Sequence, residues 1–342
     1  MNTKVTILGI ETSCDDTSIA LVENNTLLSS VIANQDVHKK YGGVVPELAS
    51  RSHQTNIIPV IKEALNIANK QINDIDAIAF TLGPGLLGSL LVGTSFAKGL
   101  SIALNKPLIE VNHLKGHVLS HFIVEPAEEK ELPSFPHLCL LISGGHTQII
   151  IVNNPYEMDI IGTTIDDAAG EAFDKAAKLL GFDYPGGPII DILAKSGNKY
   201  KFNFPKPNVK GLDFSFSGIK TSLLYFLKDN LKANPKFIEE NINDICASYQ
   251  KIIVEILVEK AILATKQTGI NTITISGGVS ANSEIRKEFL QLKNNNINVF
   301  LPKIKFTTDN AAMIAVAGYY KFLKKEFCSL DVSPYAKFSL TL

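Results

Sequence analysis

The sequence predicts an α/β protein built from two similar lobes. Residues 5–23 have the pattern of an apolar strand, a polar turn and a second strand, and residues 138–152 repeat it. Alternating apolar and helical segments follow in both places. A chain of 342 residues, 45% of them hydrophobic, is long enough for two such cores. Two ordinary hairpin turns are the alternative explanation of the repeat.

The turn in each predicted hairpin is rich in hydroxyl and glycine residues. Residues 11–17 have the sequence Glu-Thr-Ser-Cys-Asp-Asp-Thr, and Ser143 is followed by Gly144 and Gly145. Backbone N–H groups in such turns can bind a phosphate. We therefore expect two lobes that face each other across a central cleft holding a nucleotide.

A charged, proline-containing stretch at residues 125–134 marks the expected boundary between the lobes. We place the N-terminal lobe at residues 1–132 and the C-terminal lobe at residues 133–309. A C-terminal helix, residues 310–342, is expected to complete the N-terminal lobe.

The N-terminal lobe contains two predicted helices after its hairpin. A turn-rich loop at residues 41–47 precedes an amphipathic helix at residues 53–70, and a buried strand follows at residues 75–81. The glycine-rich segment at residues 83–88 then opens an apolar helix. Its bare amides suit a phosphate, but a tight strand-to-helix turn packed on the sheet explains the glycines as well.

Two histidines four residues apart form the most distinctive pattern of this lobe. Residues 107–111 have the composition of a short buried strand, and Asn112 is a good helix N-cap. His113 and His117 would then lie on one face of a helix. Two such imidazoles can bind one divalent metal with a third ligand from elsewhere. The alternative is chance spacing, with either ring hydrogen-bonded in the core.

Acidic residues are dense at the start of a helix predicted for residues 165–175. A helix N-terminus tolerates negative charge, which explains Asp166 and Asp167. It does not explain Asp174, two turns further on, which could bind a ligand hydroxyl or ammonium group.

Two further turns of the C-terminal lobe suit a ligand. Residues 184–188, Tyr-Pro-Gly-Gly-Pro, form a rigid turn that a ligand can approach closely, and Asp191 is expected to begin the next helix. A strand at residues 273–276, a double glycine and a helix from Ser283 would suit a ribose or an adenine face.

Composition excludes several classes of protein. The net charge of −1 provides no global basic field for nucleic acid. The four cysteines show no C-x-x-C spacing, which favours a reducing compartment over a disulfide framework or a cysteine zinc site. The apolar run at residues 86–104 is interrupted by glycines and a lysine, and residues 1–4 leave no room for a signal peptide. We expect a soluble, cytoplasmic protein.

The chain resembles the bacterial TsaD family of tRNA N6-adenosine threonylcarbamoyltransferases. The motifs that carry the resemblance run in order from residue 8 to residue 312: GIETSCDDTSIAL, GGVVPELASRSH, GPGLLGSLLVG, NHLKGH, LLISGGHTQI, DDAAGEAFDKAAKLLG, YPGGP, FSFSGIKTSL, SGGVSAN and TTDNAA. The resemblance implies the ASKHA fold of acetate and sugar kinases, actin and heat-shock chaperones.

The resemblance also implies one divalent metal per subunit. It assigns the metal to His113, His117 and Asp309, the last of which precedes an apolar helix predicted at residues 311–321. Two histidines and one carboxylate with open positions suit Fe(II), with Zn(II) as the alternative.

The implied donor substrate is threonylcarbamoyl-adenylate, whose transfer to adenosine 37 of tRNA would release AMP. Asp15 and Asp16 match the acidic pair of the first turn and are candidate catalytic residues, although the family commonly has Glu at the second position. The expected contacts to the adenylate are Leu141, Ile142, Ser143, Gly144, Gly145, Asp174, Gly187, Asp191 and Asn282.

The resemblance implies three partners besides the adenylate: tRNA, a TsaB-like paralogue and a TsaE-like ATPase. One segment of the chain has the composition of a tRNA contact, because lysines alternate with aromatic residues. A solvated loop with its aromatic side chains packed inward is the alternative. The segment comprises Lys195, Lys199, Tyr200, Lys201, Phe202, Phe204, Lys206 and Lys210.

Three other functions fit the sequence less well. A zincin metallopeptidase requires H-E-x-x-H, but Leu114 stands where the glutamate would be. A sugar or acetate kinase has no need of the histidine pair. A catalytically idle ATP-binding scaffold would lack the histidines and Asp309. His121, one turn beyond His117, matches no family motif, and we expect it to take no part in the site.

Overall fold

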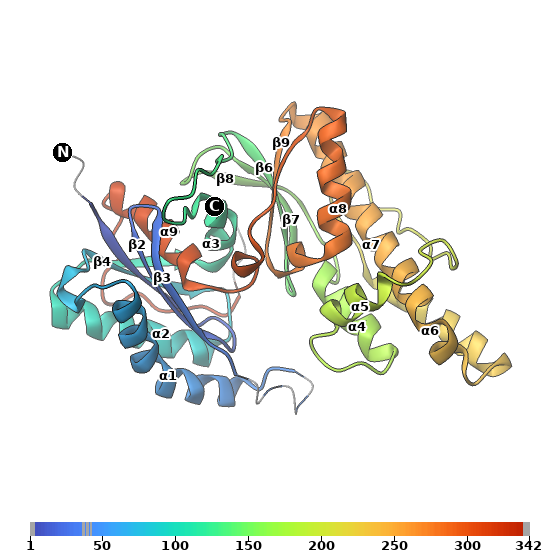
Figure 1. Ribbon diagram of the computed structural model, residues 1–342, viewed down its shortest axis with the longest axis horizontal. Coiled ribbons are helices and arrows are strands. Elements are labelled where there is room, and N and C mark those ends of the chain that lie inside the picture. The colour runs from blue at the N-terminus through green and yellow to red at the C-terminus, as the bar shows by residue number, and fades with distance from the viewer. Residues whose placement is uncertain (1–3, 36–37, 39–40, 42, 338–342) are drawn as a thin grey trace. The chain divides into compact units, whose positions relative to one another are not determined.

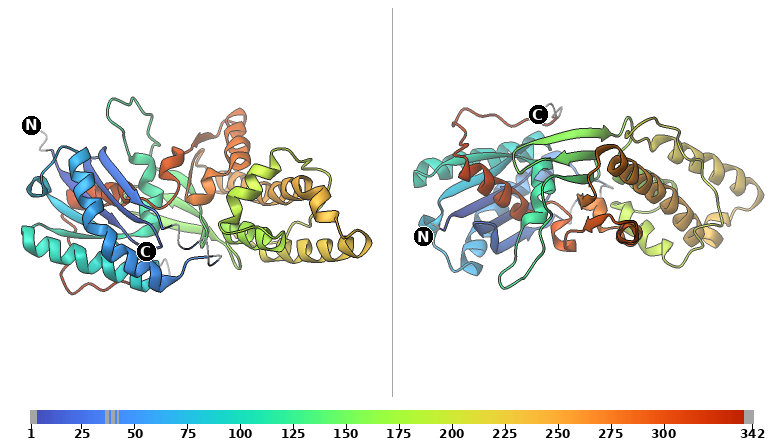
Figure 2. Two further views of the ribbon diagram at one scale, coloured as in Figure 1. Left: turned by 60° about the horizontal axis from the view of Figure 1, so that its bottom comes forward. Right: turned by 90° about the horizontal axis from the view of Figure 1, so that it is seen from above.

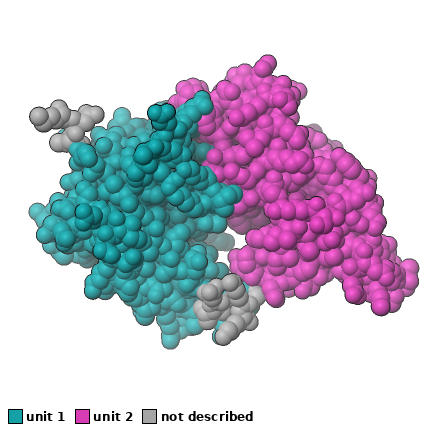
Figure 3. All heavy atoms as spheres, viewed as in Figure 1, with its two compact units in different colours: residues 1–133, 154–157, 303–342 teal, residues 134–153, 158–302 magenta. Residues whose placement is uncertain are grey.

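The computed structural model describes residues 4–35, 38, 41 and 43–337. The chain divides into two compact units, shown in different colours in Figure 3. Unit 1 contains Met1–Pro133, Asn154–Glu157 and Lys303–Leu342, and unit 2 contains Ser134–Asn153 and Met158–Pro302. Gly42 of the expected turn-rich loop, and residues 338–342 of the expected C-terminal helix, lie outside the described residues.

Unit 1 is built on a five-stranded sheet with the order β3-β2-β1-β4-β5 (Figure 1). The first three strands pair antiparallel, whereas β4 pairs parallel to β1, and β5 pairs parallel to β4. The central strands are buried along their length, which is typical of a sheet covered by helices on both faces. The strands are β1 (Thr6–Glu11), β2 (Thr17–Glu23), β3 (Thr26–Ala33), β4 (Ala77–Gly83) and β5 (Leu108–Asn112).

Helices cover both faces of this sheet, and alternate residues of β1 point to each. Leu8 and Ile10 belong to the core shared with α1 (Pro46–Ile67) and α2 (Leu87–Leu104). The residue between them, Gly9, instead faces α9 (Ala311–Leu323) on the other side. The short α3 (His113–Leu119) packs against α9. Figure 2 shows the helices in two further orientations.

The contact between β1 and α9 is very close. A Cβ added to Gly9 would lie 2.4 Å from the Ala311 carbonyl oxygen, and one added to Gly318 would lie 2.4 Å from the Ala79 Cβ. Only glycine at these positions lets the helix backbone rest on the strands. The apolar positions of α9 are correspondingly buried.

Two helix boundaries of unit 1 differ from the sequence prediction. α1 begins at Pro46 and not at residue 53, because proline in the first turn and Glu47 beside it suit a helix N-terminus. The expected loop at residues 41–47 therefore ends inside the helix. The expected C-terminal helix occupies only Ala311–Leu323. The chain then returns along the sheet, where the Cys328 and Tyr335 amides donate to the Leu108 and Leu82 carbonyls.

Among the described helices, α2 has the length and apolar composition that could cross a membrane. Core helices of soluble proteins share these properties. α2 packs against α1 and β4.

Unit 2 repeats the topology of unit 1. Its sheet has the order β10-β9-β6-β7-β8, with β6, β7 and β8 antiparallel and β9 and β10 parallel to β6. Read from the other edge, this is the strand order and direction of unit 1, which confirms the duplicated α/β fold. The strands are β6 (His137–Ile142), β7 (Thr147–Val152), β8 (Met158–Thr163), β9 (Thr272–Ser276) and β10 (Asn298–Phe300).

Helices and the sheet of unit 2 share one large core. The long α7 packs against α5, α6 and α8, and α4 packs against α5 and α6. The helices are α4 (Ala169–Leu179), α5 (Gly186–Ala194), α6 (Ser217–Ala233), α7 (Phe237–Thr268) and α8 (Ser283–Gln291). Short 3₁₀ turns occur in both units at Ile72–Asp74, Ser120–Phe122, Gly278–Ala281, Leu292–Asn295 and Ile304–Phe306.

The acids expected in the first turn of α4 lie before the helix instead, because α4 begins at Ala169. Asp166 accepts hydrogen bonds from the Phe216 and Ser217 amides and from the Ser217 hydroxyl, and so caps the start of α6. Asp167 pairs with Lys175, 2.6 Å away. The predicted start of this helix at residue 165 was wrong, and both acids lie directly before its N-cap, Ala168.

The substitution Gly9→Ala tests the close packing of α9 on β1. The added Cβ would force the two backbones apart, and we expect the free energy of unfolding to fall by about 1–3 kcal/mol. Gly99→Ala is the matched control, because nothing lies within 4 Å of its added Cβ and alanine favours the helix. Urea denaturation of both variants measures the difference. Equal stability of the two variants would contradict the packing argument.

Candidate functional site

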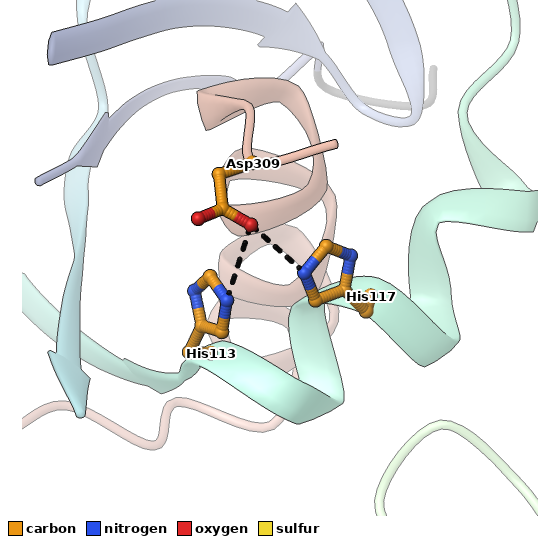
Figure 4. A group of neighbouring side chains, drawn as sticks. All are labelled: His113, His117 and Asp309. Atoms are coloured by element: carbon orange, nitrogen blue, oxygen red, sulfur yellow. Dashed lines mark hydrogen bonds and ion pairs between the residues drawn. The ribbon is translucent and has the colours of Figure 1, made fainter. Parts of the chain in front are cut away.

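His113, His117 and Asp309 lie together in unit 1 (Figure 4). The Asp309 Oδ1 atom lies 3.1 Å from His117 Nε2 and 3.4 Å from His113 Nε2. One potential ligand atom from each residue lies within 4.8 Å of the others. The two rings are perpendicular, with centroids 4.7 Å apart. The structure thus places both histidines next to Asp309, although Asp309 is distant from them in sequence.

Two helix starts position these three side chains. Asn112 ends β5, and its side chain accepts hydrogen bonds from the Leu114 and Lys115 amides at 2.9 and 3.1 Å, as the N-cap prediction required. Asp309 precedes Asn310, whose side chain caps α9 through the Met313 amide. A Cβ on Gly116 would lie 2.9 Å from Ile314 Cδ1, so glycine permits the approach of α3 to α9.

A third carboxylate, Glu11 at the end of β1, borders this group. The Glu11 side chain is 1% exposed, and its Oε2 accepts hydrogen bonds from His113 Nδ1 at 3.0 Å and from the Thr81 hydroxyl at 2.6 Å. Sequence reasoning missed Glu11. The signal that could have revealed it is an acidic residue directly after a run of buried strand residues.

The charges of the cluster are strongly coupled. Burial alone would lower the pKa of His113, but the Asp309 and Glu11 carboxylates outweigh it and raise that pKa well above its usual value. Burial alone would raise the pKa values of Asp309 and Glu11, but His113 holds both below their usual range. The two carboxylates therefore favour the protonated form of His113, which lies between them.

The donor set fits a divalent first-row metal. Two imidazole nitrogens and one carboxylate oxygen converge, and a metal with three protein ligands keeps open positions for a substrate. The Glu11 and Asp309 carboxylates also supply the negative charge that a bound cation requires. A metal on His113 would replace its proton. His121, although buried, lies outside the group.

The turn that carries Asp15 and Asp16 is held beside the metal group. The Thr12 hydroxyl donates to the Ser89 carbonyl, and His53 Nε2 contacts the Cys14 carbonyl at 3.1 Å. Burial first, and then the charges of Asp15 and Asp309, raise the pKa of the Cys14 thiol. The Ser13 hydroxyl of the same turn lies 3.1 Å from His113 Nδ1. Asp15 and Asp16 are partly exposed. His53, a second residue that sequence reasoning missed, also contacts the Thr17 hydroxyl at 2.7 Å.

The glycine-rich segment at residues 83–88 forms a packed turn. The Leu86 amide donates to the Ser13 carbonyl at 2.7 Å, and the Gly85 amide donates to the Ala336 carbonyl. A Cβ on Gly85 would lie 2.5 Å from the Ser13 oxygen. Both amides are therefore engaged within the protein, as a tight turn requires.

The loop between β6 and β7 presents backbone groups. Leu141 and Ile142 are fully buried at the end of β6, so neither residue presents surface to a ligand. Gly144 and Gly145 are exposed, and a Cβ added to either would meet nothing within 4 Å. Gly170, in the first turn of α4, packs closely on the Ser143 carbonyl. The exposed loop therefore adjoins the N-terminus of α4, whose first two amides donate to the Thr147 hydroxyl and the Ser143 carbonyl.

The other expected substrate residues of unit 2 connect successive helix starts. Asp174 Oδ1 accepts hydrogen bonds from the Gly186 and Gly187 amides at 2.9 and 3.2 Å. Burial raises the pKa of Asp174, although these two amides oppose the shift. Asp174 thus secures the start of α5 from a neighbouring helix.

Asp191 and Asn282 make the next connection. Asp191, which lies within α5 and does not begin it as we expected, accepts hydrogen bonds from the Ser283 amide and hydroxyl. The Asn282 side chain caps α8 and donates to the Gln250 side chain at 2.7 Å. The 3₁₀ turn Gly278–Ala281 before Asn282 contacts both β6 and α4. The expected substrate residues therefore lie on contiguous elements of unit 2.

The lysine-rich segment at residues 195–210 has the features of the alternative interpretation. Lys199 pairs with Glu284, Lys201 with Asp244 and Lys206 with Glu259. Phe204 is buried, and Phe202 packs against Phe226 and Phe237. Tyr200 alone among its aromatic residues is largely exposed. Most of the charge and aromatic surface is used within the protein.

Solved structures with low sequence identity show the same fold. HypF from T. kodakarensis matches with a TM-score of 0.60 and 15% identity over 96% of this chain and 49% of its own. Component A of (R)-2-hydroxyglutaryl-CoA dehydratase from Acidaminococcus fermentans matches with a TM-score of 0.54 and 14% identity, over 93% of this chain and 98% of its own. The two mixed sheets and these likenesses establish the ASKHA fold.

Sequence relatives establish the family. The family model for TsaD, described as tRNA N6-adenosine threonylcarbamoyltransferase, matches residues 26–316. A protein of that name from Porphyromonas gingivalis strain W83 is 57% identical over 99% of this chain and all of its own. Another from Christiangramia forsetii is 56% identical over 98% of both chains. The chain belongs to the TsaD family of tRNA N6-adenosine threonylcarbamoyltransferases.

Proposed function

We propose that this enzyme transfers the threonylcarbamoyl group from threonylcarbamoyl-adenylate to N6 of adenosine 37, in tRNAs that read codons beginning with A, with release of AMP. Membership of the family supports the transferred group and the tRNA acceptor. The observation that carries the metal-assisted form of the proposal is the convergence of His113, His117 and Asp309. Fe(II) is the proposed metal, with Zn(II) as the alternative.

The reaction requires attack by a weak nucleophile. The N6 lone pair forms a bond to the carbamoyl carbon, the bond from that carbon to the phosphate oxygen breaks, and AMP leaves with the electron pair. The amine loses one proton. An exocyclic adenine amine is poorly nucleophilic, so the carbonyl must be polarised and the reactants aligned. A bound divalent metal would supply Lewis acidity toward the threonylcarbamoyl group.

The residues of unit 1 would hold the metal and receive the proton. His113, His117 and Asp309 would be its ligands. Asp15 and Asp16 are the proposed proton acceptors, because they are partly exposed on a turn whose Ser13 hydroxyl lies 3.1 Å from His113 Nδ1.

The residues of unit 2 would bind the adenylate. The Gly144 and Gly145 amides, in the exposed part of the loop, would hold the phosphate. Ser143, whose amide donates to the His146 carbonyl, and the buried Leu141 and Ile142 would hold this loop in place. Around the nucleoside we place Asp174, Gly187, Asp191 and Asn282, whose support is the contiguity of their helix starts.

The same proposal includes a TsaB-like paralogue and a TsaE-like ATPase as partners and a cytoplasmic location. Half-exposed aliphatic side chains on α1 and α2, which pack side by side, support a protein partner on unit 1. They are Ile58, Ile67, Leu87, Leu91 and Ile102. The free cysteines Cys14, Cys139, Cys246 and Cys328 agree with a reducing compartment.

His113→Ala tests the metal centre. We expect threonine transfer to tRNA to fall on the order of 100-fold, because one metal ligand is lost. The fold should remain intact by circular dichroism. Metal content and transfer of radiolabelled threonine are measured together, with His121→Gln as the control outside the ligand group. Full transfer by His113→Ala with unchanged metal content would exclude the metal-centred mechanism.

Metal removal gives an independent check. Treatment with a chelator should abolish transfer by the wild-type enzyme, and added Fe(II) or Zn(II) should restore it, because the open coordination positions are the proposed source of polarisation. Transfer is measured before and after readdition. Full activity of demonstrably metal-free enzyme would refute the proposal.

Gly144→Val tests the phosphate site. The added side chain has room in the folded protein but would occupy the space proposed for the phosphate. We expect the affinity for AMP, measured by calorimetry, to fall at least about tenfold, a loss of about 1.4 kcal/mol. Gly218→Val is the control, because this exposed glycine is equally unhindered and lies outside the proposed site. Equal affinity of both variants for AMP would place the phosphate elsewhere.

A further inference from the structure

We propose that Glu11 is the residue that positions His113 for metal binding, by accepting a hydrogen bond from its Nδ1–H group and so presenting the Nε2 lone pair to the metal. This inference rests on the proposed metal centre and deepens it. Glu11 is a positioning residue, because it contacts a ligand of the metal and not the metal itself.

The contacts place the His113 ring between two carboxylates. Nδ1 lies 3.0 Å from Glu11 Oε2, and Nε2, on the other side of the ring, lies 3.4 Å from Asp309 Oδ1. The edge of the ring that would bind the metal, at Nε2, is therefore the one that points away from Glu11. Glu11 thus contacts Nδ1 of the imidazole, and Asp309 lies near Nε2.

Glu11 is itself held rigidly. Its Oε1 accepts a hydrogen bond from the Ser13 amide at 2.5 Å, and its Oε2 accepts one from the Thr81 hydroxyl at 2.6 Å. These donors come from the turn after β1 and from β4. A buried carboxylate with both oxygens engaged has one orientation, and it transmits that orientation to His113.

The chemistry of the pair determines which nitrogen binds the metal. A neutral imidazole has one N–H and one lone pair, and an ionised carboxylate can only accept. Glu11 therefore requires the proton on Nδ1 and leaves the lone pair on Nε2. The Ser13 hydroxyl, 3.1 Å from Nδ1, could not fix this choice alone, because a hydroxyl can donate or accept. Carboxylates in this position commonly orient histidine ligands of metals.

The second histidine lacks this arrangement. His117 Nδ1 is buried, and it has no hydrogen-bond partner among the described residues. The His117 side chain is 2% exposed, so packing holds the ring. The two ligands therefore differ, and loss of Glu11 should disturb His113 selectively.

The test compares Glu11→Gln with the wild-type protein loaded with Zn²⁺. Glutamine has the same shape, but its amide both donates and accepts and so tolerates either imidazole tautomer. Competition with a chromophoric chelator measures zinc affinity, which should fall about 10–100-fold. Glu110→Gln is the matched control, because Glu110 is a carboxylate of the same unit that pairs with Lys321. Its zinc affinity should stay within about twofold of wild type, well inside that range.

Thr81→Val separates positioning of His113 from general support of the turn. This variant removes a hydrogen bond to Glu11 but keeps the carboxylate beside His113. We expect it to lower zinc affinity less than Glu11→Gln does. An equal loss in both variants would indicate that Glu11 only anchors the surrounding strands, and would overturn the inference.

Nitrogen-15 spectra of labelled histidine in the zinc-loaded wild-type protein provide a readout that needs no variant. We expect His113 to carry its proton on Nδ1 and zinc on Nε2. Zinc on Nδ1, or unchanged zinc affinity in Glu11→Gln, would refute the positioning role of Glu11 but not the metal centre. Failure of the wild-type protein to bind zinc or Fe(II) at all would contradict the metal centre itself.

Discussion

The close contact between β1 and α9 is the constraint on which the arrangement of His113, His117 and Asp309 depends. Gly9 lets the start of α9 approach β1 to a distance that no side chain would allow. Glu11 ends that strand, and Asp309 immediately precedes that helix. The two carboxylates therefore lie on opposite sides of His113, which α3 brings between them. Gly9, which has no side chain, thus permits the approach of β1 to α9 that brings the two carboxylates to His113.

The duplicated topology gives the two units equivalent turns with different chemistry. In unit 1 the turn between β1 and β2 is tied to α1 and α2, and its Ser13 contacts His113. In unit 2 the turn between β6 and β7 exposes Gly144 and Gly145 beside the start of α4. One fold thus offers a rigid side-chain site in one unit and an open backbone site in the other. This difference underlies the division of metal and adenylate between the units in the proposed function.

Acidic residues in unit 2 illustrate how a functional motif can also be a structural device. Asp166 caps α6, Asp174 holds the start of α5, and Asp191 holds the start of α8. Each carboxylate accepts hydrogen bonds from amides at the start of a later helix, which lack partners within that helix. Three helix N-termini are thereby fixed relative to one another. A ligand bound there would meet helix starts that are already ordered, which reduces the ordering that binding requires.

The sequence by itself determined strands β1, β2, β4, β5, β6, β7 and β9, the repeated hairpin, the Asn112 cap and the spacing of His113 and His117, because these depend on local periodicity and capping. It did not reveal β3 and β8. The family motifs added Asp309. Only the tertiary structure decided that Glu11 and His53 border the site, that Asp166 serves α6, and that the lysines near residue 200 are largely paired with acids. These contacts join residues far apart in the chain, so no local pattern encodes them. The long-range packing of β1, α3 and α9 turned a pair of histidines into a charged cluster with a defined orientation.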